Sequence, residues 1–318
     1  MSSGKRIDVH HHLLPSFLRE AQMTADIDVV SYAGFPEWTP EHSSSLMDQL
    51  GIEHALFSYS APGIYFGDEN AVIGLSRQCN EYLKTEIQLS PKRFGGFATL
   101  PLPNIDAALA EIEYSLDTLN LDGIGLLSNV DGKYAGHAEL DPVFSELDRR
   151  SAVVFIHPTY PPKGTTKALQ IPDPVMEFMF ETTRLVGNMI FSGLLERCPN
   201  IRFILPHSGG AVPFLAHRMS VFENLPKFKA NMPAGAMHYL KSLYFDTTTS
   251  GNPIPLGALQ GLADSKHILF GTDYPYMKPD RIQLETSFID GFIGFNEETR
   301  PLMERANALS LFPRFSDN

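Results

Sequence analysis

Short apolar runs alternate along the chain with longer stretches in which apolar residues recur every three to four positions. The short runs predict buried strands and the longer stretches predict helices packed against them. This alternation is typical of repeated βα units with parallel strands. We expect eight strands, at residues 6–10, 54–59, 94–99, 123–127, 152–157, 202–207, 243–246 and 267–271.

Eight strand and helix pairs in 318 residues predict an α/β fold, the (β/α)8 TIM barrel, and a doubly wound open sheet is the structural alternative. Three helix starts support the spacing. Asn104 precedes a helical pattern over 105–116, and Asp141 and Asp173 each stand before a proline and a helical pattern. We expect these three side chains to cap their helices.

The chain shows no internal repeat and no linker rich in Pro, Gly or Ser, so we predict a single barrel domain over 1–318. Residues 13–45 do not fit a simple βα unit. We interpret them as a small insertion or lid over the C-terminal face of the barrel. The irregular stretch 60–70 follows the second strand and is expected at the same rim.

The formal net charge of −12, with no basic cluster longer than Arg149-Arg150, argues against nucleic acids and anionic membrane surfaces as partners. No stretch approaches about 18 apolar residues, and no apolar signal region follows the first residues, so we expect a soluble cytoplasmic protein. Cys79 and Cys198 lie far apart and are expected to be reduced structural thiols.

A histidine triplet, His10-His11-His12, stands where the first strand would end. Side chains at positions i and i+2 of a strand point to the same face. His10 and His12 therefore converge, whereas His11 faces the other side as a packing or supporting residue. Two neutral imidazoles from one strand would supply half of a four-ligand metal site.

The other expected strand ends add matching groups. His157 ends the fifth strand, His207 the sixth, and Asp273 follows the eighth. Barrel enzymes carry their catalytic side chains at these carboxyl ends. We therefore predict His10, His12, His157 and Asp273 as metal ligands.

His207 would stand beside this metal, where it could transfer a proton or hold a metal-bound water. Three imidazoles and one carboxylate suit Zn²⁺, with Mn²⁺ as the alternative. We expect one divalent ion, because the fourth strand, 123–127, ends without a Lys or Glu to bridge a second.

The sequence resembles the amidohydrolase superfamily, in the branch that contains aminocarboxymuconate semialdehyde decarboxylase and the non-oxidative aromatic acid decarboxylases such as those of 6-methylsalicylate. The resemblance covers nearly the whole chain and implies that His10, His12, His157 and Asp273 hold the metal and that His207 is catalytic. One departure is that the usual HGGG-like stretch here reads HSGG. The motifs that carry the resemblance are DVHHH, FIHP, PHSGGAVPFLAHR, LYFDTTTS and HILFGTDYPY.

The resemblance also suggests a role for Arg218. In the muconate-semialdehyde enzyme an arginine at a similar position reaches into the neighbouring subunit's site, so we hypothesise a homodimer, or a dimer-based oligomer, in which Arg218 meets the substrate. Core packing explains Tyr59 equally well, whereas we expect Tyr274 to contact the substrate. Aromatic residues near the rim could bound a flat substrate: Trp38, Tyr59, Tyr65, Phe66, Tyr274 and Tyr276.

Together these features favour a carbon–carbon lyase that removes the carboxyl group of a hydroxylated aromatic acid of the salicylate type, such as 6-methylsalicylate, without an organic cofactor. The proton for the ring carbon would come from Asp273 or His207. The same ligands would also serve a hydrolase of a lactone or amide, which is the second hypothesis. A metal-stabilised binding protein is the third, and it is disfavoured because structural metal sites are normally closed.

Overall fold

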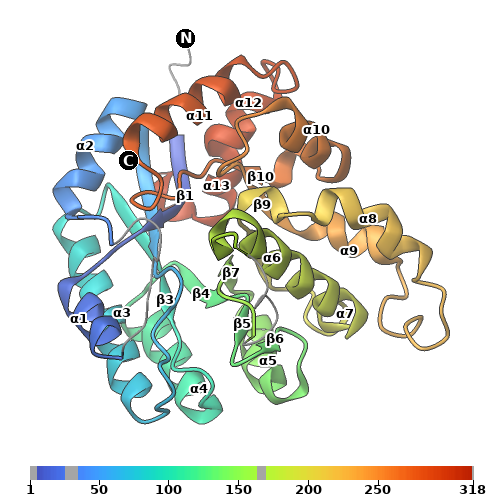
Figure 1. Ribbon diagram of the computed structural model, residues 1–318, viewed down its shortest axis with the longest axis horizontal. Coiled ribbons are helices and arrows are strands. Elements are labelled where there is room, and N and C mark those ends of the chain that lie inside the picture. Colours follow the sequence, from blue (N-terminus) through green and yellow to red (C-terminus); the bar gives the residue numbers. More distant parts are fainter. Residues whose placement is uncertain (1–5, 26–34, 163–169, 317–318) are drawn as a thin grey trace.

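The computed structural model describes residues 6–25, 35–162 and 170–316, and its centre is an eight-stranded parallel sheet curved into a barrel (Figure 1). Backbone bonds from Val9 N to Phe270 O (3.0 Å) and from Asp273 N to His10 O (2.8 Å) bring the first and last strands together. The predicted TIM-barrel class is confirmed. The strands, in spatial order, are β1 (Arg6–His12), β2 (Ile52–Ser58), β3 (Phe94–Thr99), β4 (Gly123–Leu127), β7 (Val153–His157), β8 (Arg202–Leu205), β9 (Tyr244–Asp246) and β10 (Ile268–Leu269).

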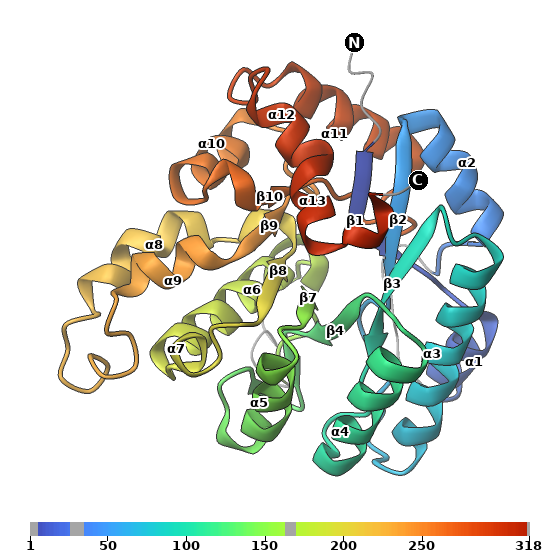
Figure 2. The ribbon, with the colours of Figure 1, turned by 180° about the vertical axis from the view of Figure 1, so that it is seen from behind.

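Helices surround this sheet and cover its outer face (Figures 1 and 2). The described helices are α1 (Ser16–Thr24), α2 (Pro40–Leu50), α3 (Ala71–Leu89), α4 (Ile105–Glu113), α5 (Asp141–Arg149), α6 (Asp173–Phe191), α7 (Leu194–Arg197), α8 (Val212–Val221), α9 (Ala236–Ser242), α10 (Pro253–Leu262), α11 (Pro279–Gly291), α12 (Thr299–Pro301) and α13 (Asn307–Leu311). Short π-helical turns lie at 114–118 and 302–306, and 3₁₀ turns lie at 138–140, 207–209, 265–267 and 313–315.

The barrel has two different ends. Inward-facing apolar residues of the strands form a cluster with the C-terminal segment, where Phe312 packs edge-on to Phe97 and Phe315 stacks on His54 near the start of β2. In Figure 2, α13 accordingly lies beside β1 and β10. This apolar plug fills the amino end of the barrel and leaves the carboxyl ends of the strands for polar side chains.

The helix starts differ in part from the expectation. Asn104 does cap α4, since its side chain accepts a hydrogen bond from the backbone N–H of Ala107. Asp141 and Asp173 do not cap. Each is instead the first helical residue and makes no capping bond, so its charge lies within the first turn, where the helix dipole favours it.

Gly193, with φ +77°, divides the helical pattern predicted after Asp173 into α6 and α7. A left-handed residue ends a helix, and glycine adopts that conformation without a Cβ penalty. A short antiparallel hairpin that the pattern did not predict, β5 (Asn129–Val130) and β6 (Lys133–Tyr134), follows β4.

The predicted insertion 13–45 contains α1 and the first part of α2, and its residues 26–34 lie outside the described part of the chain. Helix α2 packs against β2 and buries Leu46 and Met47. The lid role of this segment stays a prediction. No helix among the described residues is long and apolar enough to cross a membrane.

Candidate metal centre and active site

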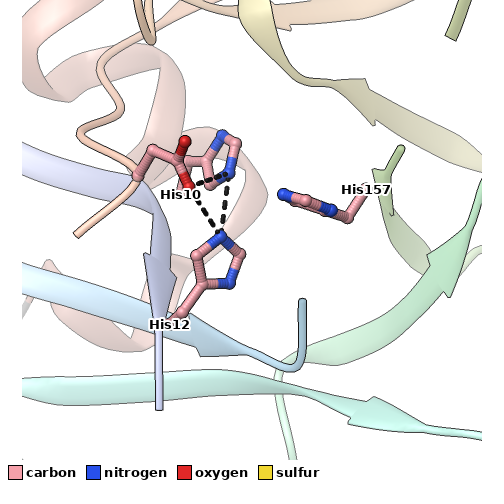
Figure 3. Close-up of side chains that lie close together, drawn as sticks. His10, His12 and His157 are labelled. Atoms are coloured by element: carbon pink, nitrogen blue, oxygen red, sulfur yellow. Dashed lines mark hydrogen bonds and ion pairs between the residues drawn. The ribbon is translucent and has the colours of Figure 1, made fainter. Parts of the chain in front are cut away.

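Strand β1 carries the first two predicted ligands. The Nε2 atoms of His10 and His12 lie 3.1 Å apart, and both side chains are fully buried. Figure 3 shows the rings of His10, His12 and His157 converging on one point from two strands. The expected separation of the triplet is also seen, since the ring of His11 bonds to Asp8 and Ser43 instead.

His157, the last residue of β7, and Asp273, four residues beyond β10, complete the group. Oδ1 of Asp273 lies 3.1 Å from Nε2 of His12 and 3.5 Å from Nε2 of His10. The ligand atoms of all four residues lie within 4.8 Å of one another. The structure therefore brings together the four side chains that the sequence analysis assigned to a metal.

The outward nitrogens of the three imidazoles all have acceptors. Nδ1 of His10 lies 2.7 Å from Oδ2 of Asp246, Nδ1 of His157 lies 2.7 Å from the carbonyl of Pro158, and Nδ1 of His12 lies 3.2 Å from the carbonyl of Ser58. In the neutral imidazole, donation from Nδ1 leaves the Nε2 lone pair directed inward. Metal-ligating histidines are oriented in this way, so the residues present fit a divalent ion.

The electrostatics of the cluster are consistent with ligation. Burial alone would lower the pKa of His10, but the carboxylates of Asp246 and Asp273 outweigh it and raise that pKa to about 10. Burial lowers the pKa of His12. For His157, burial together with the neighbouring His12 and His10 holds the pKa well below its usual value. Two imidazoles are therefore kept neutral, the form that binds metals.

Asp273 is also poised as an anion. Burial would raise its pKa, but hydrogen bonds from His10, His12 and His207 hold that pKa well below the usual value. Its backbone has φ +63°, a left-handed conformation that is uncommon for a non-glycine residue. Strain of this kind persists only where neighbouring contacts fix the backbone, and it is concentrated at functional sites.

His207 lies beside the ligands, as predicted. Its Nε2 is 3.6 Å from Oδ2 of Asp273, and its ring packs edge-on to His10 with the centroids 5.1 Å apart. It begins a run of four residues with positive φ, 207–210, which turns the chain sharply into the barrel mouth. Its buried Nδ1 has no hydrogen-bond partner among the described residues, as expected of a group that meets a ligand.

A cavity of about 170 Å³ opens beside these groups. His157, His207 and Asp273 form its polar end, and Phe178 and Met179 of α6 form part of its apolar wall. A larger cavity of about 700 Å³ adjoins it through Tyr160 but contains none of the predicted ligands. The small cavity has the size of a single substituted aromatic ring. Its other lining residues are Ser60, Ala61, Tyr160, Pro174, Thr249, Tyr276 and Met277.

Two predicted substrate contacts lie away from this cavity. Tyr274 is buried against Leu46 and Ile282, and Tyr276 lines the cavity in its place. Arg218 is exposed on α8, with its guanidinium 5.6 Å from the ring centre of Phe222. In a single chain neither the Tyr274 nor the Arg218 side chain lines the cavity.

Sequence reasoning did not assign a role to Asp246. Its Oδ2 accepts from His10, and its Oδ1 accepts from the backbone N–H groups of His207 (2.8 Å) and Thr248 (3.0 Å). The sequence feature that could have identified Asp246 as a site residue is its position: it is the last residue of the expected seventh strand, at the same rim as the predicted ligands.

Comparison with known proteins places these features in context. Residues 7–314 match the family described as Amidohydrolase. The 6-methylsalicylic acid decarboxylase of Penicillium expansum is 36% identical over 97% of this chain and 96% of its own length. A 2-amino-3-carboxymuconate-6-semialdehyde decarboxylase of Dictyostelium discoideum is 29% identical over 77% of this chain and 68% of its own.

Solved structures show the same fold. A crystal structure described as an amidohydrolase II superposes with a TM-score of 0.90 at 28% identity, covering 97% of this chain and 99% of that one. A dihydroxybenzoic acid decarboxylase from Polaromonas sp. JS666, with bound manganese and 2-nitroresorcinol, gives a TM-score of 0.83 at 22% identity and covers 98% of this chain and 97% of its own. The predicted resemblance is confirmed, and close homologues are carboxy-lyases.

Proposed function

Because the chain belongs to the amidohydrolase family, we propose that it is a metal-dependent, non-oxidative decarboxylase of a hydroxylated aromatic acid of the salicylate type. The observation that supports this most directly is the convergence of three imidazoles and one carboxylate beside a ring-sized cavity that also contains His207. The Penicillium relative makes 6-methylsalicylate the first substrate to test.

His10, His12, His157 and Asp273 would hold one divalent ion. When bound, that ion supplies a Lewis acid and a template for the carboxylate and ortho-hydroxyl oxygens of the substrate. We propose Zn²⁺ first, because its usual ligands are nitrogen and oxygen donors of this kind, and Mn²⁺ second, because the Polaromonas structure contains manganese. No organic cofactor is needed for the chemistry proposed below.

Asp273 and His207 are the groups that can move the proton. Either would deliver it to the ring carbon that carries the carboxylate, which interrupts the aromatic ring; Asp273, held as an anion, would first take up a proton from water or from His207. The bond between that carbon and the carboxylate then breaks, CO₂ leaves, and the electron pair of the broken bond restores aromaticity. Both side chains line the cavity, and their nearest atoms are 3.6 Å apart, so a small side-chain movement brings them to the distance at which a proton passes directly between them.

We further propose that the protein forms a homodimer, or a dimer-based oligomer, in which Arg218 reaches the substrate of the other copy. Its exposure on α8 makes it available to a second chain. Large apolar side chains are exposed along the same helix and just after it: Phe214 (63%), Val221 (61%) and Phe222 (40%). Such clusters on a protein surface mark association sites. Separately, we propose a cytoplasmic location.

The test is CO₂ release from a panel of hydroxybenzoates that includes 6-methylsalicylate, with the protein loaded with Zn²⁺ or Mn²⁺. We expect release from at least one salicylate. Lactone or amide hydrolysis without release from any member would overturn the proposal in favour of the hydrolase. The Arg218→Ala variant should lose activity or assembly, measured by light scattering after size-exclusion chromatography. If it keeps both, the shared-arginine arrangement is wrong.

A further inference from the structure

Asp8 is a fully buried carboxylate that touches neither the cavity nor the metal-ligand atoms, yet all its acceptor positions are used. Oδ1 accepts from the backbone N–H groups of His10 (3.0 Å) and Thr272 (3.1 Å). Oδ2 accepts from the Thr272 hydroxyl (2.6 Å) and from Nδ1 of His11 (2.8 Å). A buried carboxylate is retained only when such bonds replace its hydration.

These bonds join the two segments that carry three of the four predicted ligands. On β1, the pairing with β2 is irregular between Asp8 and His11, and Asp8 itself satisfies the N–H of His10. On the other side, Asp8 holds both the backbone and the hydroxyl of Thr272, the residue immediately before Asp273.

The backbone N–H of Asp273 in turn donates to the carbonyl of His10 (2.8 Å). The left-handed backbone of Asp273, with φ +63°, is thus fixed by its own bond to His10 and by the bonds that hold Thr272, the residue before it. A conformation of this kind is strained for a non-glycine residue and persists only under such restraint.

A second arm of the network runs to α2. Nε2 of His11 lies 2.9 Å from Oγ of Ser43, and the indole N–H of Trp38 donates to the same oxygen at 2.8 Å. His11, Ser43 and Asp8 are all fully buried. These bonds explain the role of His11, the middle histidine of the triplet: it connects Asp8 to Ser43 of α2.

We propose that Asp8 is a positioning residue that holds His10, His12 and Asp273 in the relative arrangement a metal needs, and that His11 braces it from α2. The proposal rests on the metal-dependent function proposed above. Asp8 acts through the backbone and through Thr272, so its effect is on how well the ligands are arranged and not on the reacting atoms. Outer residues of this kind alter metal affinity by about 10- to 100-fold.

The decisive variant is Asp8→Asn, which keeps the shape and the Oδ1 acceptor but replaces the second acceptor by a donor. We expect Co²⁺ or Zn²⁺ to bind about 10- to 100-fold more weakly, measured by competition with a chelator well below the unfolding temperature. We also expect the visible spectrum of the Co²⁺ protein to change, because ligand geometry sets its bands. The milder Thr272→Val variant should shift both readouts in the same direction, and it serves if Asp8→Asn does not fold.

The matched control is Glu181→Gln. Glu181 is also fully buried and accepts bonds from Asn129, Tyr134 and Arg184, but it contacts none of the predicted ligands. The Glu181→Gln variant should have a lower unfolding temperature, and its metal affinity and Co²⁺ spectrum should be those of the wild type. If Asp8→Asn or Thr272→Val behaves like Glu181→Gln, Asp8 is only a stabilising residue and the inference is wrong, while the proposed function stands. If wild type binds metal but releases no CO₂, the function fails, and the Asp8 comparison still decides the inference.

Discussion

The carboxylate of Asp246 lies 2.7 Å from Nδ1 of His10. The other oxygen of the same group accepts the backbone N–H of His207 at 2.8 Å. A single buried carboxylate therefore orients a predicted metal ligand and fixes the start of the turn that carries the predicted catalytic histidine. The proposed metal binding and the proposed proton transfer would thus be coupled through one side chain.

Replacing Asp246 by Ala should weaken metal binding about 10- to 100-fold, because the ring of His10 loses its orienting acceptor. His157→Ala, which removes a ligand, should abolish stoichiometric metal retention altogether. Both are checked by metal analysis after dialysis against a weak chelator. Stoichiometric metal in His157→Ala would refute its assignment as a ligand, and an unchanged affinity in Asp246→Ala would remove Asp246 from the site.

His207→Gln should lower kcat by about 10²- to 10⁴-fold while leaving metal content unchanged, because the side chain transfers a proton but is not expected to ligate. The measurement is steady-state CO₂ release at saturating substrate, together with metal analysis of the same sample. His217→Gln, the same change at an exposed position on α8, is the matched control and should behave as the wild type. Loss of metal in His207→Gln would instead make His207 a ligand.

Much of the centre could be predicted because strand geometry determines it. Two residues apart on a strand, His10 and His12 must share a face, and the carboxyl ends of parallel strands must meet at one rim, which brings His157 and Asp273 to them. For His10, His12 and His157 neither step depends on loop conformation, whereas Asp273 also needs the left-handed turn beyond β10. The amino acid pattern along the strands was therefore sufficient to predict that most of this group of four side chains lies together.

The remaining features depend on directions that a linear pattern does not contain. Tyr274 and Tyr276 both follow the eighth strand, but the chain turns there, and only Tyr276 faces the cavity. Asp246 ends β9, which does not pair with β1 in the sheet. Only the three-dimensional arrangement of the barrel shows that its carboxylate meets the ring of His10. The bond between His11 and Ser43 likewise depends on how α2 lies against β1.

Charge gives a prediction about substrate choice. Among the described residues that line the 170 Å³ cavity there is no Lys or Arg. A carboxylate bound at the metal end is compensated, whereas a second one at the apolar wall would be buried without a partner. We expect 3-hydroxyphthalate, in which a carboxylate replaces the methyl group of 6-methylsalicylate, to bind at least about 100-fold more weakly.

The measurement is the inhibition constant of each acid against a common substrate. Met277→Lys places a cation at the cavity wall and should narrow the difference between the two acids, while Met277→Gln, of similar length and neutral, should not. Equal binding of the two acids to the wild type would indicate that a cation that does not line the cavity in a single chain reaches it. An Arg218→Ala variant tests whether that cation is the arginine.

The two cysteines give a prediction about pH. Burial raises the pKa of Cys79 to about 12 and that of Cys198 to about 11. We expect iodoacetamide to label neither thiol appreciably in the native protein at pH 8 and to label both once the chain is unfolded, because the thiolate is the reactive form.

The same shifts determine how stability varies with pH. In the unfolded chain each thiol loses its proton near pH 8.5 to 9, whereas in the folded protein it keeps the proton until about pH 11 or 12. The folded state thus holds more protons above pH 9, so the free energy of unfolding falls as pH rises, by up to about 1.4 kcal/mol per pH unit for each thiol. Below pH 8 the thiols contribute no slope. Urea unfolding between pH 8 and 10.5 should show a decline, to which His10 adds because its pKa is raised to about 10, and Cys198→Ala should make the decline above pH 9 shallower by up to about 1.4 kcal/mol per pH unit. An unchanged slope in that variant would mean that other groups cause the decline.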